Sequence, residues 1–261
     1  MNLLYEVGGH VATITFNRPE SRNALLPEMG DALVDLVRQA ESDEQVRVIV
    51  LTGAGNAFSA GADIKLMGRG DRLGRTALVG RERNLHGSWV TEQISRRQKP
   101  MIAAVNGVVA GMACAYVLAS DFAIADRDAR FVFGFIKLGF VPDSGSTFLL
   151  TRRVGAAQAQ RIALLGDPIG AEEALRIGLV QEVVDSPHFR SRVSQVADKL
   201  ASMPPHAVRL TRTLLANAVD SDFRGAAEAE ALAQGVLGET EDHKEAVRAF
   251  AEKRAPRFTG K

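Results

Sequence analysis

Cysteine is almost absent from this sequence, which has only Cys114 among its 261 residues. A single cysteine excludes an internal disulfide and a cysteine-based zinc cluster. Four of the histidines, at positions 10, 188, 206 and 243, have no spacing typical of a metal site. We therefore expect neither a disulfide framework nor a metal centre.

Long apolar runs and targeting signals are also missing. No window of about eighteen residues is uninterruptedly apolar, so we expect no membrane span and no membrane partner. The N-terminal stretch lacks a basic segment followed by a long apolar run, so we expect no signal peptide. These features together predict a cytoplasmic protein.

The chain has no excess of charge of either sign, since Lys plus Arg number 32 and Asp plus Glu number 31. Without a global basic field, we expect no nucleic-acid partner. The dinucleotide fingerprint and the Walker pattern are absent too, so no nucleotide cofactor is indicated. A local exception is the basic tail at residues 253–261, which composition alone assigns to a solvated terminus.

What the sequence does contain is a succession of strand and helix patterns. Alternating apolar residues predict a hairpin around Gly8-Gly9, and two continuous apolar runs predict strands buried on both faces. A helix is expected from about Pro27, and small residues at 111–120 predict another. The predicted strands are residues 3–7, 11–16, 46–52, 101–105, 122–125 and 130–133.

The character of the chain changes after about residue 186. Four segments rich in Ala, Leu and Glu are helix-like, namely 187–202, 204–219, 221–237 and 240–253. Strand and helix repeats followed by an all-helical tail predict an α/β core over residues 1–185 and a helical region over residues 186–261. Residues 71–98 are expected to form a mobile loop that leads into a helix.

Two loops in the core carry a chemical signal. Small residues at positions 60 to 62 follow one buried strand, and Asn106 to Ala113 follows another and opens a helix. Small residues allow a ligand to approach the backbone, and a helix start presents unpaired N–H groups. Each such donor can stabilise a developing oxyanion by about 3 kcal/mol. Either loop alone is more often a packing feature than a functional one.

The order and spacing of several motifs make the whole chain resemble the enoyl-CoA hydratase/isomerase (crotonase) superfamily. These motifs are Asn17-Arg18-Pro19, Asn23-Ala24-Leu25, Ala60-Gly61-Ala62-Asp63-Ile64, Lys99-Pro100, Asn106-Gly107, Leu138-Gly139, Pro142-Asp143-Ser144-Gly145, Gly166-Asp167, Gly178-Leu179-Val180 and the closing Lys253-Arg254…Pro256-Arg257-Phe258. The resemblance implies a spiral of ββα units, and a C-terminal helical region that makes homotrimers or hexamers. Exposed apolar stripes in that region, such as Leu210, Leu214, Leu215 and Val219, agree with subunit contacts.

The resemblance also implies an acyl-CoA thioester as the substrate, with no separate cofactor because coenzyme A is part of it. The thioester oxygen would meet the N–H groups of Ala62 and Met112, where Met112 replaces the usual glycine and is tolerable if its φ stays negative. The CoA moiety would be lined by Asn23, Ala24, Ala60, Ile64 and, from a neighbouring subunit, the tail with Phe258. We interpret Asp63 as orienting its loop and Lys65 as facing solvent or a phosphate.

The resemblance breaks down where hydratases carry two water-handling glutamates, because this chain has Ala115 and Phe135 at those positions. Neither can hold or deprotonate water, so ordinary hydratase chemistry is doubtful. Asp143 resembles the lone acid of the isomerase branches, including the ring-opening isomerase of phenylacetate breakdown. A single carboxylate can move a proton between two carbons, so we predict double-bond isomerisation. The structural alternative for Asp143 is a helix N-cap.

Other reactions remain as alternatives at the same carboxylate. In aryl-CoA dehalogenases of this superfamily it is a nucleophile, and His86 and Trp89 in the preceding helix could then assist, although His86 is about two residues out of register. Thioester hydrolysis, an atypical hydratase and a non-catalytic acyl-CoA-binding homologue are further possibilities. Five phenylalanines around Asp143 indicate either an aromatic acyl pocket or core, namely Phe131, Phe133, Phe135, Phe140 and Phe148.

Overall fold

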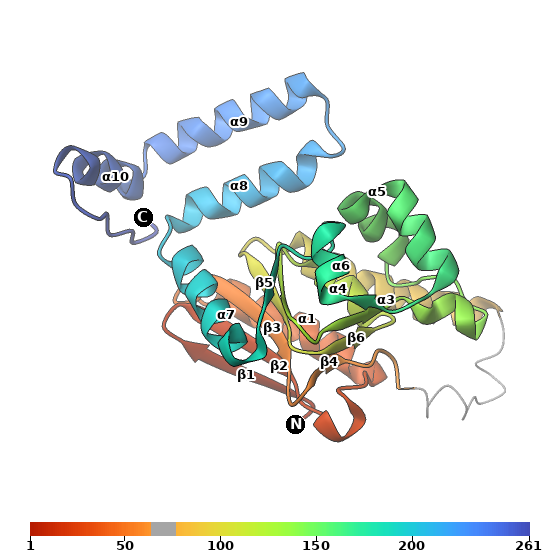
Figure 1. Cartoon of the computed structure of the whole chain (residues 1–261). Coiled ribbons are helices and arrows are strands. Elements are labelled where there is room, and N and C mark those ends of the chain that lie inside the picture. Colours follow the sequence, from red (N-terminus) through yellow and green to blue (C-terminus); the bar gives the residue numbers. More distant parts are fainter. Residues whose placement is uncertain (64–76) are drawn as a thin grey trace.

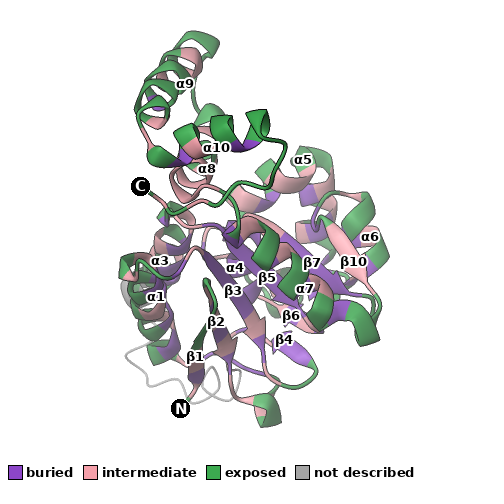
Figure 2. Ribbon diagram, turned by 90° about the vertical axis from the view of Figure 1, so that its left-hand side faces the viewer, coloured by how far each residue is buried: buried purple, intermediate pink, exposed green. Residues whose placement is uncertain are grey.

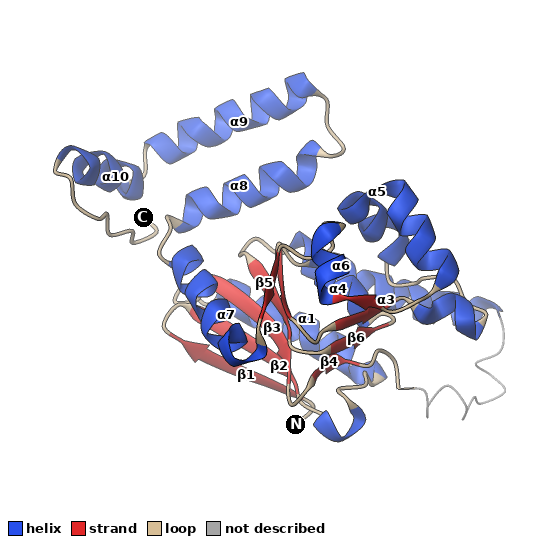
Figure 3. Cartoon of the chain, in the orientation of Figure 1, coloured by secondary structure: helices blue, strands red, loops and turns tan. Residues whose placement is uncertain are grey.

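The computed structural model describes residues 1–63 and 77–261, in which the strands form two sheets (Figures 1 and 3). The larger sheet has the order β1-β2-β3-β5-β7-β10. Its first pair is antiparallel and its other neighbours are parallel. Its strands are β1 (Leu3–Gly8), β2 (Val11–Phe16), β3 (Val48–Gly53), β5 (Met101–Val105), β7 (Phe122–Asp126) and β10 (Glu182–Val184).

The smaller sheet has the order β4-β6-β8-β9, with only the last pair antiparallel. Its strands are β4 (Ala57–Ser59), β6 (Val108–Ala110), β8 (Arg130–Val132) and β9 (Ile169–Gly170). The sequence prediction missed β4 and β6 and placed loops there. Three residues are too few to show an alternating pattern, so these two strands carried no detectable signal.

Helices follow the strand pairs and cover the sheets (Figure 3). The helices of the core are α1 (Pro27–Ser42), α3 (Ala77–Arg96), α4 (Ala113–Ala119), α5 (Ser146–Leu165), α6 (Ala171–Arg176) and the 3-10 turns η1 (Pro19–Ser21) and η3 (Gly134–Leu138). The chain repeats one pattern three times, in the pairs β3-β4, β5-β6 and β7-β8. In each pair the first strand belongs to the larger sheet and the second to the smaller sheet, and a helix follows the pair. This repetition is the predicted α/β spiral of ββα units.

Strand β3 shows why an uninterrupted apolar run forms a strand here. Ile49 and Leu51 belong to the apolar cluster on the α1 side, whereas Val48 and Val50 belong to the cluster on the α7 side. Because both faces are covered, alternate positions are equally apolar. The predicted two-sided burial of this strand is confirmed, and Figure 2 shows the buried residues concentrated on the strands and α4.

The C-terminal helices are α7 (Ser186–Ala201), α8 (Pro205–Ala218), α9 (Phe223–Gly238) and α10 (Glu241–Ala251). Helix α7 packs on the larger sheet through Phe189, Val193 and Ala197. Helices α8 to α10 extend away from the sheets, and α9 is mostly exposed (Figures 1 and 2). From Ser186 onward the described elements are all helices, and the division of the chain at residue 185 stays a prediction. Within the described residues, no helix is long and apolar enough to span a bilayer.

Candidate active site

The smaller sheet brings the two glycine-containing loops side by side. Strands β4 and β6 are parallel neighbours, so the segments that leave them, residues 60–62 and 110–112, lie next to each other. Gly61 has φ +80°, and a Cβ atom there would lie 2.6 Å from the carbonyl oxygen of Ala110. Only glycine fits both the backbone angle and this approach. We call these two segments the amide corner.

Two asparagines of the motifs, the buried Asn23 and the half-buried Asn106, hold the β3–β4 turn that precedes the amide corner. Asn106 donates from Nδ2 to the carbonyl oxygens of Gly53 (2.8 Å) and Gly55 (3.0 Å). Asn23 donates to Ala54 (2.9 Å) and Ala57 (2.7 Å). Asn23 is 0% exposed and its side chain fixes the turn, and the predicted contact of this region with a ligand stays a prediction.

The amides of Ala62 and Met112 are available as donors. Ala62 forms a parallel β-bridge with Leu25. The two hydrogen bonds of this bridge are made by the neighbours of Ala62: Leu25 N–H donates to Gly61 O, and Asp63 N–H donates to Leu25 O. Within the described chain, neither the Ala62 N–H nor the Met112 N–H donates a hydrogen bond. Met112 has φ −58°, and a side chain is tolerable at this position as long as φ is negative, as the sequence analysis required. The sequence-predicted donors therefore lie on adjacent loops.

Arg18 secures the outer side of the amide corner. Its guanidinium donates to the carbonyl oxygen of Ala24 (2.6 Å) and to the Asp63 carboxylate (3.3 Å). The contact fits the interpretation of Asp63 as a residue that orients its loop. Ala60 is half-buried and donates its amide to Arg22 O (2.8 Å), and Ala24 is almost fully buried. The predicted ligand contacts Ile64 and Lys65 lie outside the described residues.

Asp143 begins a tight turn between η3 and α5, which we call the acid turn (residues 143–146). Ser146 donates its amide to the Asp143 carbonyl oxygen (2.9 Å), and Ser144 and Gly145 both have positive φ. The Asp143 Oδ1 atom is buried and has no hydrogen-bond partner among the described residues. Burial raises the pKa of Asp143. Such a carboxylate is suited to proton transfer.

The acid turn reaches the amide corner through helices α3 and α4. A Cβ at Gly87 of α3 would lie 2.8 Å from Ser144 Oγ and 3.8 Å from Met112 Cε. On α4, Tyr116 lies one turn after Met112, and both burial and the charge of Asp143 raise the pKa of its hydroxyl. Ser144, Met112 and Tyr116 therefore place Asp143 beside the amide corner. The sequence prediction missed Tyr116 and Gly87, although a glycine inside a helix is an unusual choice that could have marked the second.

The two positions that would hold glutamates in a hydratase have no polar group. Ala115 is completely buried in α4. A Cβ built on Gly111 would lie 4.0 Å from Cζ of the half-buried Phe135 ring, so this ring covers the amide corner. Of the other phenylalanines, Phe131 and Phe133 are core, while Phe140 and Phe148 are exposed. The five predicted aromatics thus divide between core and surface, and Phe135 is the one beside the donors.

His86 and Trp89 face helix α1 and not the acid turn. The His86 Nε2 atom lies 2.9 Å from Asp31 Oδ1. Its ring stacks on Trp89 with 5.5 Å between centroids, and Arg38 lies 5.9 Å from the Trp89 ring centroid. The suggestion that these two residues assist Asp143 is therefore not supported by their contacts.

The basic tail packs on its own subunit, far from the amide corner (Figure 1). The carbonyl oxygen of Phe258 accepts a hydrogen bond from Arg47 (3.0 Å), and the carboxylate of Asp242 accepts from the amides of Thr259 and Gly260. Within one chain, Phe258 is therefore not brought to the predicted site. Its expected contact with the CoA of a neighbouring subunit stays a prediction.

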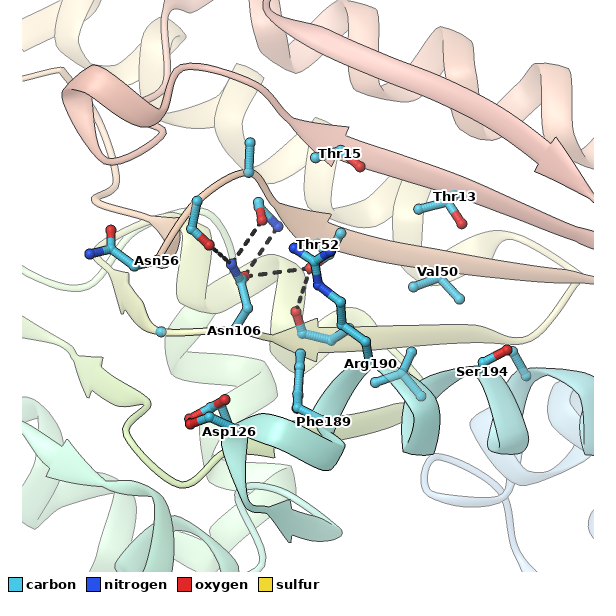
Figure 4. A pocket seen from close by; sticks show the side chains of 18 of the residues that line it. Thr13, Thr15, Val50, Thr52, Asn56, Asn106, Asp126, Phe189, Arg190 and Ser194 are labelled. Atoms are coloured by element: carbon cyan, nitrogen blue, oxygen red, sulfur yellow. Dashed lines mark hydrogen bonds between the residues drawn. The ribbon is translucent and has the colours of Figure 1, made fainter.

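A groove of about 1180 Å³ lies elsewhere, between α7 and the larger sheet (Figure 4). Its walls carry Thr13 and Thr52 on the strands and Arg190 and Ser194 on the helix. Its buried carboxylate, Asp126, accepts from Ser186 Oγ (2.8 Å), and Ala62, Met112 and Asp143 are not part of its lining. We interpret this groove as the gap between α7 and the part of the larger sheet that carries both threonines and apolar residues.

Comparison with known proteins agrees with this arrangement. Residues 6–261 match the model of the family described as enoyl-CoA hydratase/isomerase. The chain belongs to the enoyl-CoA hydratase/isomerase family. It is 36% identical over 259 residues to the 1,2-epoxyphenylacetyl-CoA isomerase of Escherichia coli K12, covering 99% of this chain and 98% of that protein.

Other relatives in the family carry hydratase names. The chain is 36% identical over 254 residues to the short-chain-enoyl-CoA hydratase of Clostridium acetobutylicum, covering 97% of this chain and 95% of the relative. The structure of enoyl-CoA hydratase from Bacillus anthracis superposes with a TM-score of 0.93 at 31% identity and full coverage of both chains. Enzymes of the enoyl-CoA hydratase/isomerase family thus include both reaction types at similar distances from this chain.

Proposed function

We propose that this enzyme isomerises the double bond of an enoyl-CoA, or of a ring acyl-CoA, with Asp143 as its acid/base. The observation that carries the proposal is the buried Asp143 Oδ1 atom, which has no partner among the described residues and belongs to a turn beside two free amides. A polar atom in that state is unfavourable for folding and is explained if a reaction uses it. The name of the Escherichia coli relative, an epoxyphenylacetyl-CoA isomerase, favours the ring substrate as one option.

In the proposed mechanism, the thioester oxygen accepts hydrogen bonds from the N–H groups of Ala62 and Met112. These bonds strengthen as charge moves onto the oxygen, and removing one such donor typically raises a barrier by about 3 kcal/mol. Helix α4 has only seven residues, so the backbone N–H of Met112 contributes more than the helix dipole. The side chains at both positions are free to vary because the donors belong to the backbone.

Asp143 then moves one proton in two steps. Its carboxylate removes the proton from the carbon next to the thioester of a 3-enoyl-CoA, and the resulting dienolate is held at the amide corner. The same carboxyl group returns that proton to carbon 4, which leaves the double bond conjugated with the thioester. Burial raises the pKa of Asp143 and so makes it a stronger base than an exposed aspartate. The cycle needs no water and no cofactor.

Hydration is the alternative that the relatives' names favour. It requires a group that activates water, and neither Ala115 nor Phe135 can do so. Nucleophilic dehalogenation has less support, because His86 is bonded to Asp31 on the α1 side. We therefore place hydratase, thioesterase and dehalogenase activities among the outcomes of the test.

The test is a panel of CoA thioesters assayed with the purified enzyme in a diode-array spectrophotometer. We expect conversion of 3-enoyl-CoA to the conjugated 2-enoyl form, with hydration of crotonyl-CoA far below a typical turnover of about 10 per second. Fast hydration of crotonyl-CoA without isomerisation would contradict the proposal. Release of halide from an aryl-CoA, or of free CoA, would replace it with the corresponding alternative, and inertness towards every thioester would favour a binding protein.

We further propose that the enzyme is a homotrimer or hexamer. Apolar side chains on the C-terminal helices are widely exposed in a single chain, including Phe223 (91%), Leu232 (75%) and Phe250 (88%). Exposed apolar groups of this size are typical of subunit interfaces. Light scattering at micromolar concentration should give three or six times the monomer mass, and a monomer alone would contradict this.

A further inference from the structure

We propose that Asn106 is a positioning residue for the two N–H donors of the amide corner, because its side chain ties together the two connections that lead to them. The inference rests on the proposed function, in which the amides of Ala62 and Met112 bind the thioester oxygen. It goes beyond the support that Asn106 gives to the β3–β4 turn, since it concerns the spacing between the two donors.

The two connections lie side by side where the chain leaves the larger sheet for the smaller one. Residues 54–56 join β3 to β4, and residues 106–107 join β5 to β6. Strands β3 and β5 are neighbours in the larger sheet, and β4 and β6 are neighbours in the smaller sheet. A Cβ atom at Gly107 would lie 2.0 Å from the carbonyl oxygen of Asn56, so the two backbones touch.

The side chain of Asn106 bridges this contact as both donor and acceptor. Its Nδ2 atom donates to the carbonyl oxygens of Gly53 (2.8 Å) and Gly55 (3.0 Å). Its Oδ1 atom accepts from the amide of Gly53 (3.3 Å). Figure 4 shows several hydrogen bonds converging on this one amide group. A single side chain from the second connection therefore holds the backbone of the first.

Strand pairing alone holds the two donor loops weakly. Strands β4 and β6 have three residues each, and their register pairs Ala57 with Val108 and Ser59 with Val109. Two steps along β4 thus match one step along β6, an irregularity that disrupts the ladder locally. A strand of three residues spans only about 10 Å, so a shift at the connections reaches the amides. Asn106 supplies the second tie just before both strands.

Loss of the Nδ2 donors should shift the two loops relative to each other without removing either amide. Bonds to the thioester oxygen strengthen as negative charge develops, so misplaced donors cost more in the transition state than in the bound substrate. Removal of an oxyanion donor typically lowers kcat by about 10²–10³-fold, and displacement should lower it less, by roughly 10-fold. KM should change by less than about 3-fold.

The experiment compares two variants of Asn106 with a control in the same turn. Asn106→Asp keeps the size and one acceptor but loses both donors. Asn106→Ala removes every bond without adding a charge, so it decides the question if the new carboxylate prevents folding. Asn56→Asp adds the same charge where the side chain is exposed and points away from Asn106 (Figure 4), so kcat should not change. Each variant is assayed below its melting temperature.

Infrared difference spectroscopy reads the hydrogen bonds to the thioester oxygen without turnover. The probe is crotonyl-CoA labelled with carbon-13 at its thioester carbonyl. Hydrogen bonds from both amides polarise the carbonyl group and lower its stretching frequency. In the parent and in Asn56→Asp the bound band should lie below that of free crotonyl-CoA. In both Asn106 variants the band should move back towards the free position.

A parental band position in the Asn106 variants would overturn the inference, whatever their kcat, because Asn106 would then only stabilise the fold. Loss of crotonyl-CoA binding in place of a band shift would overturn it too, as would an equal shift in Asn56→Asp. If the parent lowers the band but does not isomerise 3-enoyl-CoA, the proposed function fails instead. The comparison of the bands still decides the role of Asn106.

Discussion

The amide corner and the acid turn are neighbours that are built in opposite ways. The amide corner offers backbone N–H groups, and its essential residue, Gly61, is one that has no side chain. The acid turn offers one carboxyl group, and its unusual residue, Ser144, keeps a side chain at a φ that favours glycine. The first is positioned by strand pairing and the second by contacts with two helices.

We infer from this difference between backbone donors and a side-chain carboxyl group that the two segments have separate roles, one in binding and one in reaction. A donor that belongs to the backbone survives most substitutions, so the amide corner can serve many reactions of the same ligand. The carboxyl group of the acid turn can be lost by a single substitution. We infer that the amide corner determines which class of molecule binds and the acid turn determines what happens to it. The predictions below separate these two roles.

The largest effect is expected at Gly61, where Gly61→Ala should reduce thioester binding and turnover together. The new Cβ would lie 2.6 Å from Ala110 O at φ +80°, so the two loops must separate. Strain at such a φ alone is about 1–2 kcal/mol, and calorimetry should show binding weakened by roughly 10-fold or more.

The matched control for Gly61 is Gly9→Ala. Gly9 also has positive φ, +60°, but has open space around it in the β1–β2 turn. This variant should lose stability without losing binding. Unchanged binding in Gly61→Ala would show that the two loops do not act together.

A smaller effect concerns stability and pH at the acid turn. Because burial raises the pKa of Asp143 in the folded chain, folding is hindered once the group is charged. Below the pKa of Asp143 in the unfolded chain, about 3.9, the group is neutral in both states and the folded chain keeps its full stability. That stability is lost as the pH rises through the higher pKa of Asp143 in the folded chain. Asp143→Asn should therefore gain melting temperature relative to the parent at neutral pH but not at acidic pH. The exposed Asp35→Asn is a control, and a pH-independent difference would contradict the raised pKa.

The smallest effect is expected at Met112, because its proposed contribution is a backbone N–H. Met112→Ala keeps the amide and a negative φ, so turnover and KM should stay within about 3-fold, less than 1 kcal/mol. Truncation of this half-buried side chain should lower the unfolding free energy by about 1 kcal/mol. Measurement with short and long acyl chains separates pocket shape from catalysis. A loss approaching that of Gly61→Ala would mean that the side chain, and not the amide, acts on the substrate.

Much of this arrangement could be predicted from the sequence, for a physical reason. The apolar run at β3 identifies a strand buried on both faces, and the hairpin turn at Gly8-Gly9 and the helix from Pro27 are also confirmed. The α/β class and the family follow from such patterns and from motif spacing. The fold repeats ββα units although the sequence has no repeat, because each unit needs only similar apolar patterning and not similar residues.

Contacts between distant segments could not be predicted in the same way. The sequence did not indicate that the Asn23 side chain is buried and holds the β3–β4 turn. His86 was considered as a partner of Asp143, yet its side chain faces α1. A side chain's direction depends on the tertiary packing around its element, which local pattern does not encode. For the same reason, the contact between Gly87 and Ser144 emerged only from the folded chain.

The central claim, that the backbone binds and Asp143 reacts, is tested most directly by measuring both properties in Asp143→Asn. Asparagine keeps the size of aspartate but removes the base. We expect calorimetric binding of a CoA thioester to match the parent, while 3-enoyl-CoA isomerisation falls by roughly 10²-fold or more. Isomerisation at the parent rate would show that Asp143 is not the acid/base, and simultaneous loss of binding would show that the two roles are not separate.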